Sequence, residues 1–118
     1  RTSQAIQKLS LQNVKLTDSG GALVTKGAKQ SNSLRSINLS GNTLVYKTPP
    51  ELKLLLQSNS PVEELYLEKN YMGSEGIYLL AEGLEVNKTL RILDLRENEA
   101  CDEGAKYVAR ALKKNETL

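Results

Sequence analysis

Apolar residues recur along this chain at a fixed interval of 28 residues. The clearest series is Leu9, Ile37, Leu65 and Leu93, and a second series two residues further on is Leu11, Leu39, Leu67 and Leu95. Self-similarity at a fixed period of about 20 to 50 residues is typical of a solenoid, in which each repeat packs only against its neighbours. The period therefore predicts a stack of similar units with one long open surface, rather than a domain closed around a single pocket.

Each unit is predicted to contain a short strand followed by a helix. The third unit begins with the apolar pattern L-x-x-L-x-L, here Val62 to Leu67, whose last residues alternate between apolar and polar. This alternation is the period of a strand with one buried face. Further on, apolar residues from Ile77 to Leu84 recur at helical spacing. The predicted repeats span about residues 6–33, 34–61, 62–89 and 90–117.

An asparagine lies three residues after the last strand leucine in three of the units, at Asn42, Asn70 and Asn98. Its amide can both accept from and donate to the backbone of a tight turn. Stacked between repeats, such side chains would satisfy polar groups that are otherwise buried without a partner. Val14 has this position in the first unit, so we expect a less regular first turn.

Helix start signals also recur in register. Residue types that favour the N-cap position occur at intervals that are multiples of 28, at Asp18, Ser74 and Asp102. The second unit departs from this series, because Tyr46 has the equivalent position. Two residues later, Thr48-Pro49-Pro50-Glu51 has the spacing of a capping box with proline at the first helical position. The second helix is therefore expected to begin later, to be shorter, and to end before Pro61.

These patterns resemble the ribonuclease-inhibitor-like class of leucine-rich repeats. The consensus L-x-x-L-x-L-x-x-N-x-L-x-x-x-G is matched in the fourth unit by Leu90, Leu93, Leu95, Asn98 and Gly104, with Ala100 at the last leucine position. The third unit matches it with Val62, Leu65, Leu67, Asn70, Met72 and Gly76. The resemblance covers nearly the whole chain. It implies an α/β horseshoe segment with parallel strands on the concave face and helices on the convex face.

Composition limits the function classes. The net charge of +2, with 25% charged residues, gives no support for nucleic-acid binding, which needs clustered Lys and Arg. No apolar run of about 20 residues could span a membrane. The single cysteine, Cys101, cannot form an internal disulfide, which fits a reducing compartment, and we expect a cytoplasmic protein. Neither end carries the atypical repeat that normally covers a solenoid core, so we expect a part of a longer protein.

Alternate strand residues are expected to point to the concave face. The first two strands would present small neutral groups and Lys8, whereas the last two would present an acidic, partly aromatic patch. Aromatic residues and arginine dominate interface energies. The candidate partner-binding residues are Asn38, Glu64, Tyr66, Glu68, Ile92, Asp94 and Arg96. The alternative interpretation is a solvated face, on which the acids pair with Lys69 or Arg96.

Catalysis and metal binding are not expected. The carboxylates of Glu64, Glu68 and Asp94 would lie on an open sheet, and the chain contains no histidine that could act as a base or a ligand. We therefore expect no enzyme activity, no cofactor and no small-molecule substrate.

The leading functional hypothesis is a scaffold that binds a protein partner through its concave face. The resembled class also includes Ran GTPase-activating proteins, receptor sensor regions and ciliary scaffold subunits. A Ran-type activator and a structural subunit of a large assembly therefore remain alternatives. Four strands about 4.8 Å apart span only roughly 15 Å, whereas a specific interface removes about 800 Å² from each partner. Adjacent loops or repeats would have to contribute.

Overall fold

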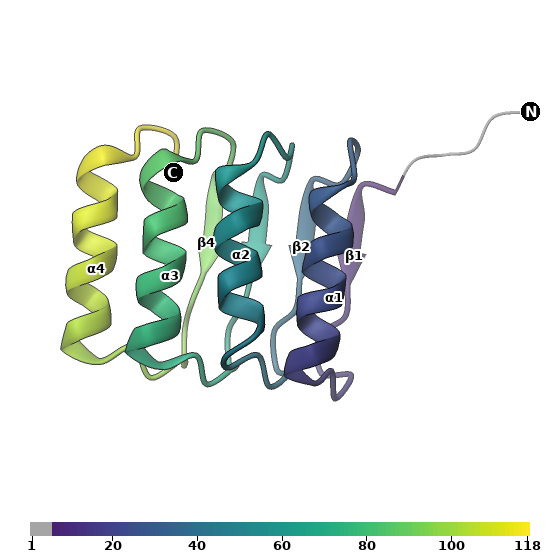
Figure 1. Ribbon diagram of the computed structural model, residues 1–118, viewed down its shortest axis with the longest axis horizontal. Coiled ribbons are helices and arrows are strands. Elements are labelled where there is room, and N and C mark those ends of the chain that lie inside the picture. The colour runs from purple at the N-terminus through teal and green to yellow at the C-terminus, as the bar shows by residue number, and fades with distance from the viewer. Residues whose placement is uncertain (1–5) are drawn as a thin grey trace, which may run out of the picture.

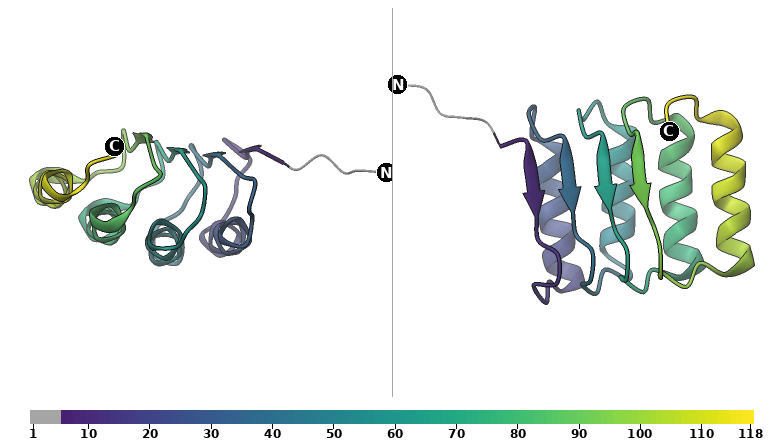
Figure 2. Two further views of the ribbon diagram at one scale, coloured as in Figure 1. Left: turned by 90° about the horizontal axis from the view of Figure 1, so that it is seen from above. Right: turned by 180° about the vertical axis from the view of Figure 1, so that it is seen from behind.

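Strands and helices alternate along the chain and separate into two layers. The computed structural model describes residues 6–118, which form β1 (Lys8–Ser10), α1 (Asp18–Lys29), β2 (Ser36–Asn38), α2 (Thr48–Gln57), β3 (Glu64–Tyr66), α3 (Gly73–Val86), β4 (Ile92–Asp94) and α4 (Cys101–Lys114). The strands form one sheet in the order β1-β2-β3-β4, and the helices cover one face of it (Figures 1 and 2). The predicted α/β leucine-rich-repeat solenoid is confirmed.

The strands pair in step with the sequence period. All three pairs are parallel, and Ile37 lies opposite Leu9 in β1 and Leu65 in β3. A slip of one residue would move every side chain to the other face of the sheet. Because the register equals the 28-residue interval, equivalent strand residues lie on the same face of the sheet in every repeat, as predicted.

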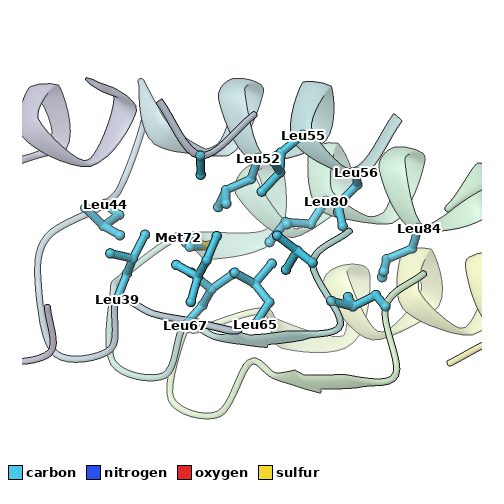
Figure 3. Packing of buried hydrophobic residues seen from close by; sticks show 14 of the residues in the cluster. Leu39, Leu44, Leu52, Leu55, Leu56, Leu65, Leu67, Met72, Leu80 and Leu84 are labelled. Carbon is cyan, nitrogen blue, oxygen red and sulfur yellow. The ribbon is translucent and has the colours of Figure 1, made fainter. Parts of the chain in front are cut away.

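The core lies between the sheet and the helices. Leu39 and Leu67 follow the strands and meet Leu52 and Leu80 from the helices (Figure 3). All four are fully buried, and burying a leucine stabilises a fold by about 1.5–3 kcal/mol. Burial is incomplete at both ends of the stack, where Leu9, Leu11, Leu93 and Leu95 are only partly buried.

The predicted N-cap residues are wrong, because each of them lies inside its helix. The N-cap of α1 is Thr17, whose Oγ1 accepts a hydrogen bond of 3.2 Å from the Gly20 N–H. The N-caps of α3 and α4 are Met72 and Ala100, neither of which has a side chain that caps the helix. The residues with N-cap preference do lie in the first turn of each helix, but the helices begin one or two residues earlier than predicted.

The second helix also lacks the predicted capping box. It is the shortest, with 10 residues, and ends at Gln57, as expected. However, its N-cap residue is Lys47, and the Thr48 Oγ1 donates to the Asp18 carbonyl at 3.0 Å instead of capping its own helix. The cap comes from the preceding repeat, since the Asp18 carboxylate accepts hydrogen bonds from three successive backbone N–H groups of residues 46–48.

The asparagines form the predicted ladder, and each serves two turns. The Asn70 amide donates at 3.0 Å to the Leu67 carbonyl in its own repeat and to the Leu39 carbonyl in the preceding one. Its oxygen accepts from the Asn42 N–H at 3.1 Å. Asn98 repeats this arrangement one unit later, donating to Leu67 at 2.8 Å. Among residues 6–118, no buried side-chain nitrogen or oxygen lacks a hydrogen-bond partner.

The prediction of a less regular first turn is wrong. Asn13 and Lys15 have φ values of 56° and 59°, close to the 57° and 60° of the equivalent Lys69 and Tyr71. The turn keeps its shape because the asparagine that binds it belongs to the next repeat. The Asn42 oxygen accepts from the N–H groups of Val14 and Leu16.

Candidate protein-binding site

The uncovered face of the sheet carries the predicted residues in two rows. In register across the strands, one row is Lys8, Ser36, Glu64 and Ile92, and the other is Ser10, Asn38, Tyr66 and Asp94. Glu68 and Arg96 follow β3 and β4 by two residues. The helices lie on the opposite face (Figure 2), so this surface is open to solvent.

Arg96 holds the two acids nearest to it. Its guanidinium makes a bidentate contact with the Asp94 carboxylate, with Nε–Oδ1 at 3.0 Å and Nη2–Oδ2 at 2.8 Å. The same Nη2 lies 3.4 Å from a Glu68 oxygen. The hydrogen bond from Arg96 holds the pKa of the Asp94 carboxyl below its usual range, and the same contact raises the pKa of Arg96. The guanidinium nevertheless remains 72% exposed, so a partner could still reach it.

Tyr66 on β3 lies between this ion pair and β2. Its ring is half-buried, its neighbours in register are Asn38 and Asp94, and its hydroxyl donates to a Glu64 oxygen at 3.2 Å. Burial raises the pKa of the Tyr66 phenol, and the hydrogen bond and negative charge of Glu64 raise it further. Five side chains are thus joined or adjacent on β3, β4 and the residues that follow these strands. We call them the concave network: Glu64, Tyr66, Glu68, Asp94 and Arg96.

Asn38 and Asp94 also stabilise the ends of their strands. Each side-chain oxygen accepts from the backbone N–H two residues on, Ser40 at 3.0 Å and Arg96 at 3.1 Å. Asn38 donates in addition to the Gln12 side chain. These intramolecular bonds give both residues a role in the fold, which is independent of any partner.

Two further features lie at the margins of the network. Ile92 is 44% exposed beside Glu64, which places an apolar group next to the charged one. Lys69 contacts Glu97 at 3.9 Å on the adjoining turns. Of the two cations expected to pair with the concave acids, Arg96 does so, whereas Lys69 pairs with a neighbouring turn.

Two exposed tyrosines in the loops were not among the predicted site residues. Tyr46 and Tyr71 lie in the segments that join strands to helices and are 78% and 59% exposed. The equivalent positions of other repeats hold polar residues, such as Ser74 for Tyr46 and Glu99 for Tyr71. The sequence signal that could have identified them is an aromatic residue at a position that is polar in other repeats.

Other kinds of site find little support in the described part of the chain. Within residues 6–118, no three His, Cys, Asp or Glu side chains are grouped so that they could hold a metal ion. No helix in the same range combines the length and the apolar character that a membrane crossing requires.

Comparison with known proteins matches the repeats. Residues 33–55 and residues 86–109 each match a family described as a leucine-rich repeat. Leucine-rich repeat-containing protein 45 of Gallus gallus is 34% identical over 109 residues, which are 91% of this chain and 16% of that protein. Ribonuclease inhibitor of Sus scrofa is 31% identical over 111 residues, which are 91% of this chain and 24% of the inhibitor.

Among solved structures, the fold is similar to that of Leiomodin-1 Actin-Binding Site 2. The TM-score is 0.87 at 20% sequence identity, and the match covers 95% of this chain and 66% of that one. At this identity the likeness supports the fold. The chain spans less than a quarter of the length of the two curated relatives, so it corresponds to a short section of their repeats.

Proposed function

Because the chain belongs to the leucine-rich-repeat family, with repeats related to those of ribonuclease inhibitors, we propose that it is a non-catalytic scaffold that binds a protein partner through its concave face. The observation that carries this proposal is the concave network, in which paired but accessible charges surround Tyr66 on the open face of the sheet. The names of the inhibitor and of the leiomodin site both refer to protein targets, which supports a protein as the kind of partner.

The network suits binding because its side chains are already ordered. Immobilising a flexible side chain on binding costs about 0.5–1.5 kcal/mol. Arg96 is held by Asp94 and Glu68 before any partner arrives, and Tyr66 is held by Glu64. Less side-chain entropy is therefore lost when a partner docks.

The chemistry of the surface indicates what a partner should present. Two of the three acids of the network, Glu68 and Asp94, share one arginine, so the surface keeps an excess of negative charge. Ile92 adds an exposed apolar group. A complementary partner would place a lysine or arginine near Glu64 and an apolar side chain over Ile92 and Tyr66.

We also propose a cytoplasmic location for this protein, since its one thiol fits a reducing compartment.

Affinity capture with matched variants tests the proposal. The double variant Tyr66→Ala/Glu68→Ala should recover the partner at least about 10-fold less well than the unmodified chain, because it removes the aromatic residue and one carboxylate of the network. The control Lys69→Ala/Glu97→Ala removes an exposed pair beside the network and should leave recovery unchanged. Equal recovery by both variants would contradict binding through the concave network.

A further inference from the structure

The small net charge of the chain hides a strong asymmetry between its halves. Residues 1–61 contain eight Lys and Arg but only two acidic residues, whereas residues 62–118 contain eight Lys and Arg and twelve acidic residues. The first half therefore carries a formal charge of +6 and the second half −4. A charge separation of this size along one molecule favours association in which opposite halves face each other.

The segments that join each strand to the following helix lie together along one edge of the solenoid, the lower edge in Figure 1. We define this loop edge as residues 11–17, 39–47, 67–72 and 95–100, with the first turns of the helices that follow them. Glu68 and Arg96 belong both to this edge and to the concave network, whereas Glu64 and Tyr66 on β3 lie outside the edge.

Two exposed tyrosines lie at the middle of the loop edge, one in each of the two central repeats. Tyr46 and Tyr71 line the same depression, with a volume of about 300 Å³. Tyr71 also lines a second depression of about 540 Å³ that extends to Lys15 in the first repeat. Tyrosine is enriched at the energetic centres of protein interfaces, so a concave surface between exposed tyrosines is a candidate docking site.

Charges on the loop edge follow the asymmetry of the whole chain. Lys15 and Lys47 are exposed in the first two repeats. Glu75, Glu99 and Asp102 are exposed in the last two. The tyrosines therefore separate a basic end of the edge from an acidic end.

Some charged groups of the edge already have partners. In the basic half, the Asp18 carboxylate is occupied by backbone N–H groups, as described above, and the Glu51 carboxylate, whose side chain is only 18% exposed, lies 3.9 Å from Lys26. In the acidic half, Lys69 lies 3.9 Å from Glu97, and Lys106 lies 3.9 Å from Glu103. Lys15 and Lys47 are therefore the exposed charged groups in the basic half of the edge, whereas the acidic half keeps more acidic than basic side chains.

We propose that the loop edge binds a second copy of this chain about a two-fold axis, with Tyr46 and Tyr71 at the centre. A two-fold interface uses the same patch on both copies and must therefore be self-complementary. Rotation about an axis between the second and third repeats brings the first repeat of one copy opposite the fourth repeat of the other. Lys15 and Lys47 of each copy then face the acidic half of the other, while the tyrosines meet in the middle.

Sedimentation equilibrium of the purified chain, from about 1 μM to 1 mM, tests for this dimer. The mass is expected to rise towards twice the monomer mass with concentration. The rise should be weaker in about 1 M salt, where the Debye length falls to about 3 Å. Tyr46→Ser/Tyr71→Ser should weaken dimerisation at least about 10-fold. The control Leu23→Ser/Val86→Ser removes two apolar residues that are also more than half exposed but lie outside the loop edge, and it should have no effect.

Charge reversal tests the orientation of the two copies. Lys15→Glu/Lys47→Glu alone and Glu75→Lys/Glu99→Lys alone should each be monomeric, because the first reverses the exposed charges of the basic end and the second removes the net negative charge of the acidic end. Mixed together, the two variants should form a heterodimer. Lys8→Glu/Lys29→Glu reverses the same charge in the basic half away from the edge, and it should dimerise as the unmodified chain does. Thermal unfolding of each variant establishes that it is folded.

Three results would overturn the proposal. The first is a monomer at every concentration. The second is a dimer that responds equally to the loop-edge variants and to their controls. The third is a dimer lost on Glu64→Ala/Tyr66→Ala, two concave residues outside the loop edge, which would place the contact on the concave face. None of these results depends on partner capture, so this proposal and the proposed function can fail separately.

Discussion

The Asp18 carboxylate, at the start of α1, accepts a hydrogen bond of 2.9 Å from the backbone N–H of Thr48, the first residue of α2. The same carboxylate accepts from the N–H groups of Tyr46 and Lys47 at 2.8 and 2.7 Å. One acidic side chain therefore caps the helix of the neighbouring repeat. This contact joins the two repeats at a point where the α2 sequence supplies no side-chain cap of its own.

Replacing Asp18 by alanine should destabilise the chain by about 1–2 kcal/mol, which is the upper part of the range for losing a helix cap. Three backbone N–H groups lose their acceptor, and the negative charge at the N-terminus of α2 is lost as well. Urea unfolding at neutral pH measures the change. Asp102, the exposed equivalent in the fourth repeat, is the control, and Asp102→Ala should cost about 0.3–1 kcal/mol through the helix dipole alone.

The stability contributed by Asp18 should depend on pH. Burial raises the pKa of this carboxyl, but its hydrogen bonds to the backbone outweigh that effect and hold the pKa below its usual value. A group whose pKa is lower in the folded state stabilises the fold above its unfolded pKa, about 3.9, and loses this contribution as the pH falls through the folded pKa. The difference in unfolding free energy between the unmodified chain and Asp18→Asn should therefore be largest near neutral pH. It should shrink below about pH 4, and a constant difference from pH 7 to pH 2 would contradict this account.

The sequence period predicted the sheet, its register and the buried leucines, because these features recur from one repeat to the next at the same interval. Asp18 could not be assigned in the same way. Rules for helix caps relate a side chain to its own helix, whereas the backbone groups that Asp18 binds lie in the next repeat, at residues 46–48. The Asp18 carboxylate and these N–H groups come close together only because the two repeats stack on each other.

The candidate site was predictable to a similar degree. Strand alternation placed Tyr66 and Asp94 side by side on the open face, and the structure pairs them in register. The bidentate contact of Arg96 with Asp94 depends on side-chain conformations that spacing does not specify. Tyr46 and Tyr71 were missed because the loops that hold them have no periodic pattern of burial.

The asparagine ladder makes a strong stability prediction. Asn70 is completely buried, and its amide binds carbonyls in two repeats. Asn70→Leu would leave the buried Asn42 N–H without an acceptor, while the Leu39 and Leu67 carbonyls would each keep one donor, from Asn42 and Asn98. One unpaired buried group costs about 1–3 kcal/mol, and we expect a loss of this size in urea unfolding. By contrast, Val14→Asn at the equivalent position should change stability by less than about 0.5 kcal/mol, since Val14 is 52% exposed and its turn is already bound by Asn42.

Leu84 and Leu112 have the same position in successive repeats but should differ in their contributions to stability. Leu84 is fully buried, whereas Leu112 on α4 is 49% exposed. Leu84→Ala is expected to cost about 2–5 kcal/mol, the range for a buried leucine. Leu112→Ala should cost less than about 1 kcal/mol, because less apolar area leaves water at that position. Thermal and urea unfolding of the two variants measure the difference, and equal losses would contradict the difference in burial between the two positions.

The phenol of Tyr66 should ionise at a higher pH than an isolated tyrosine, and Glu64 should account for part of the shift. Burial is the largest cause of the raised pKa, followed by the hydrogen bond to Glu64 and the negative charges of Glu64 and Asp94. Glu64→Ala should therefore lower the pKa of Tyr66 but leave it above about 10, because the burial remains. NMR titration of the Tyr66 ring follows this ionisation directly, and Glu97→Ala, which removes an exposed carboxylate outside the concave network, is the matched control. An unchanged pKa in Glu64→Ala would mean that the hydroxyl does not bond to Glu64 in solution. Tyr66 would then not be held in place before a partner binds.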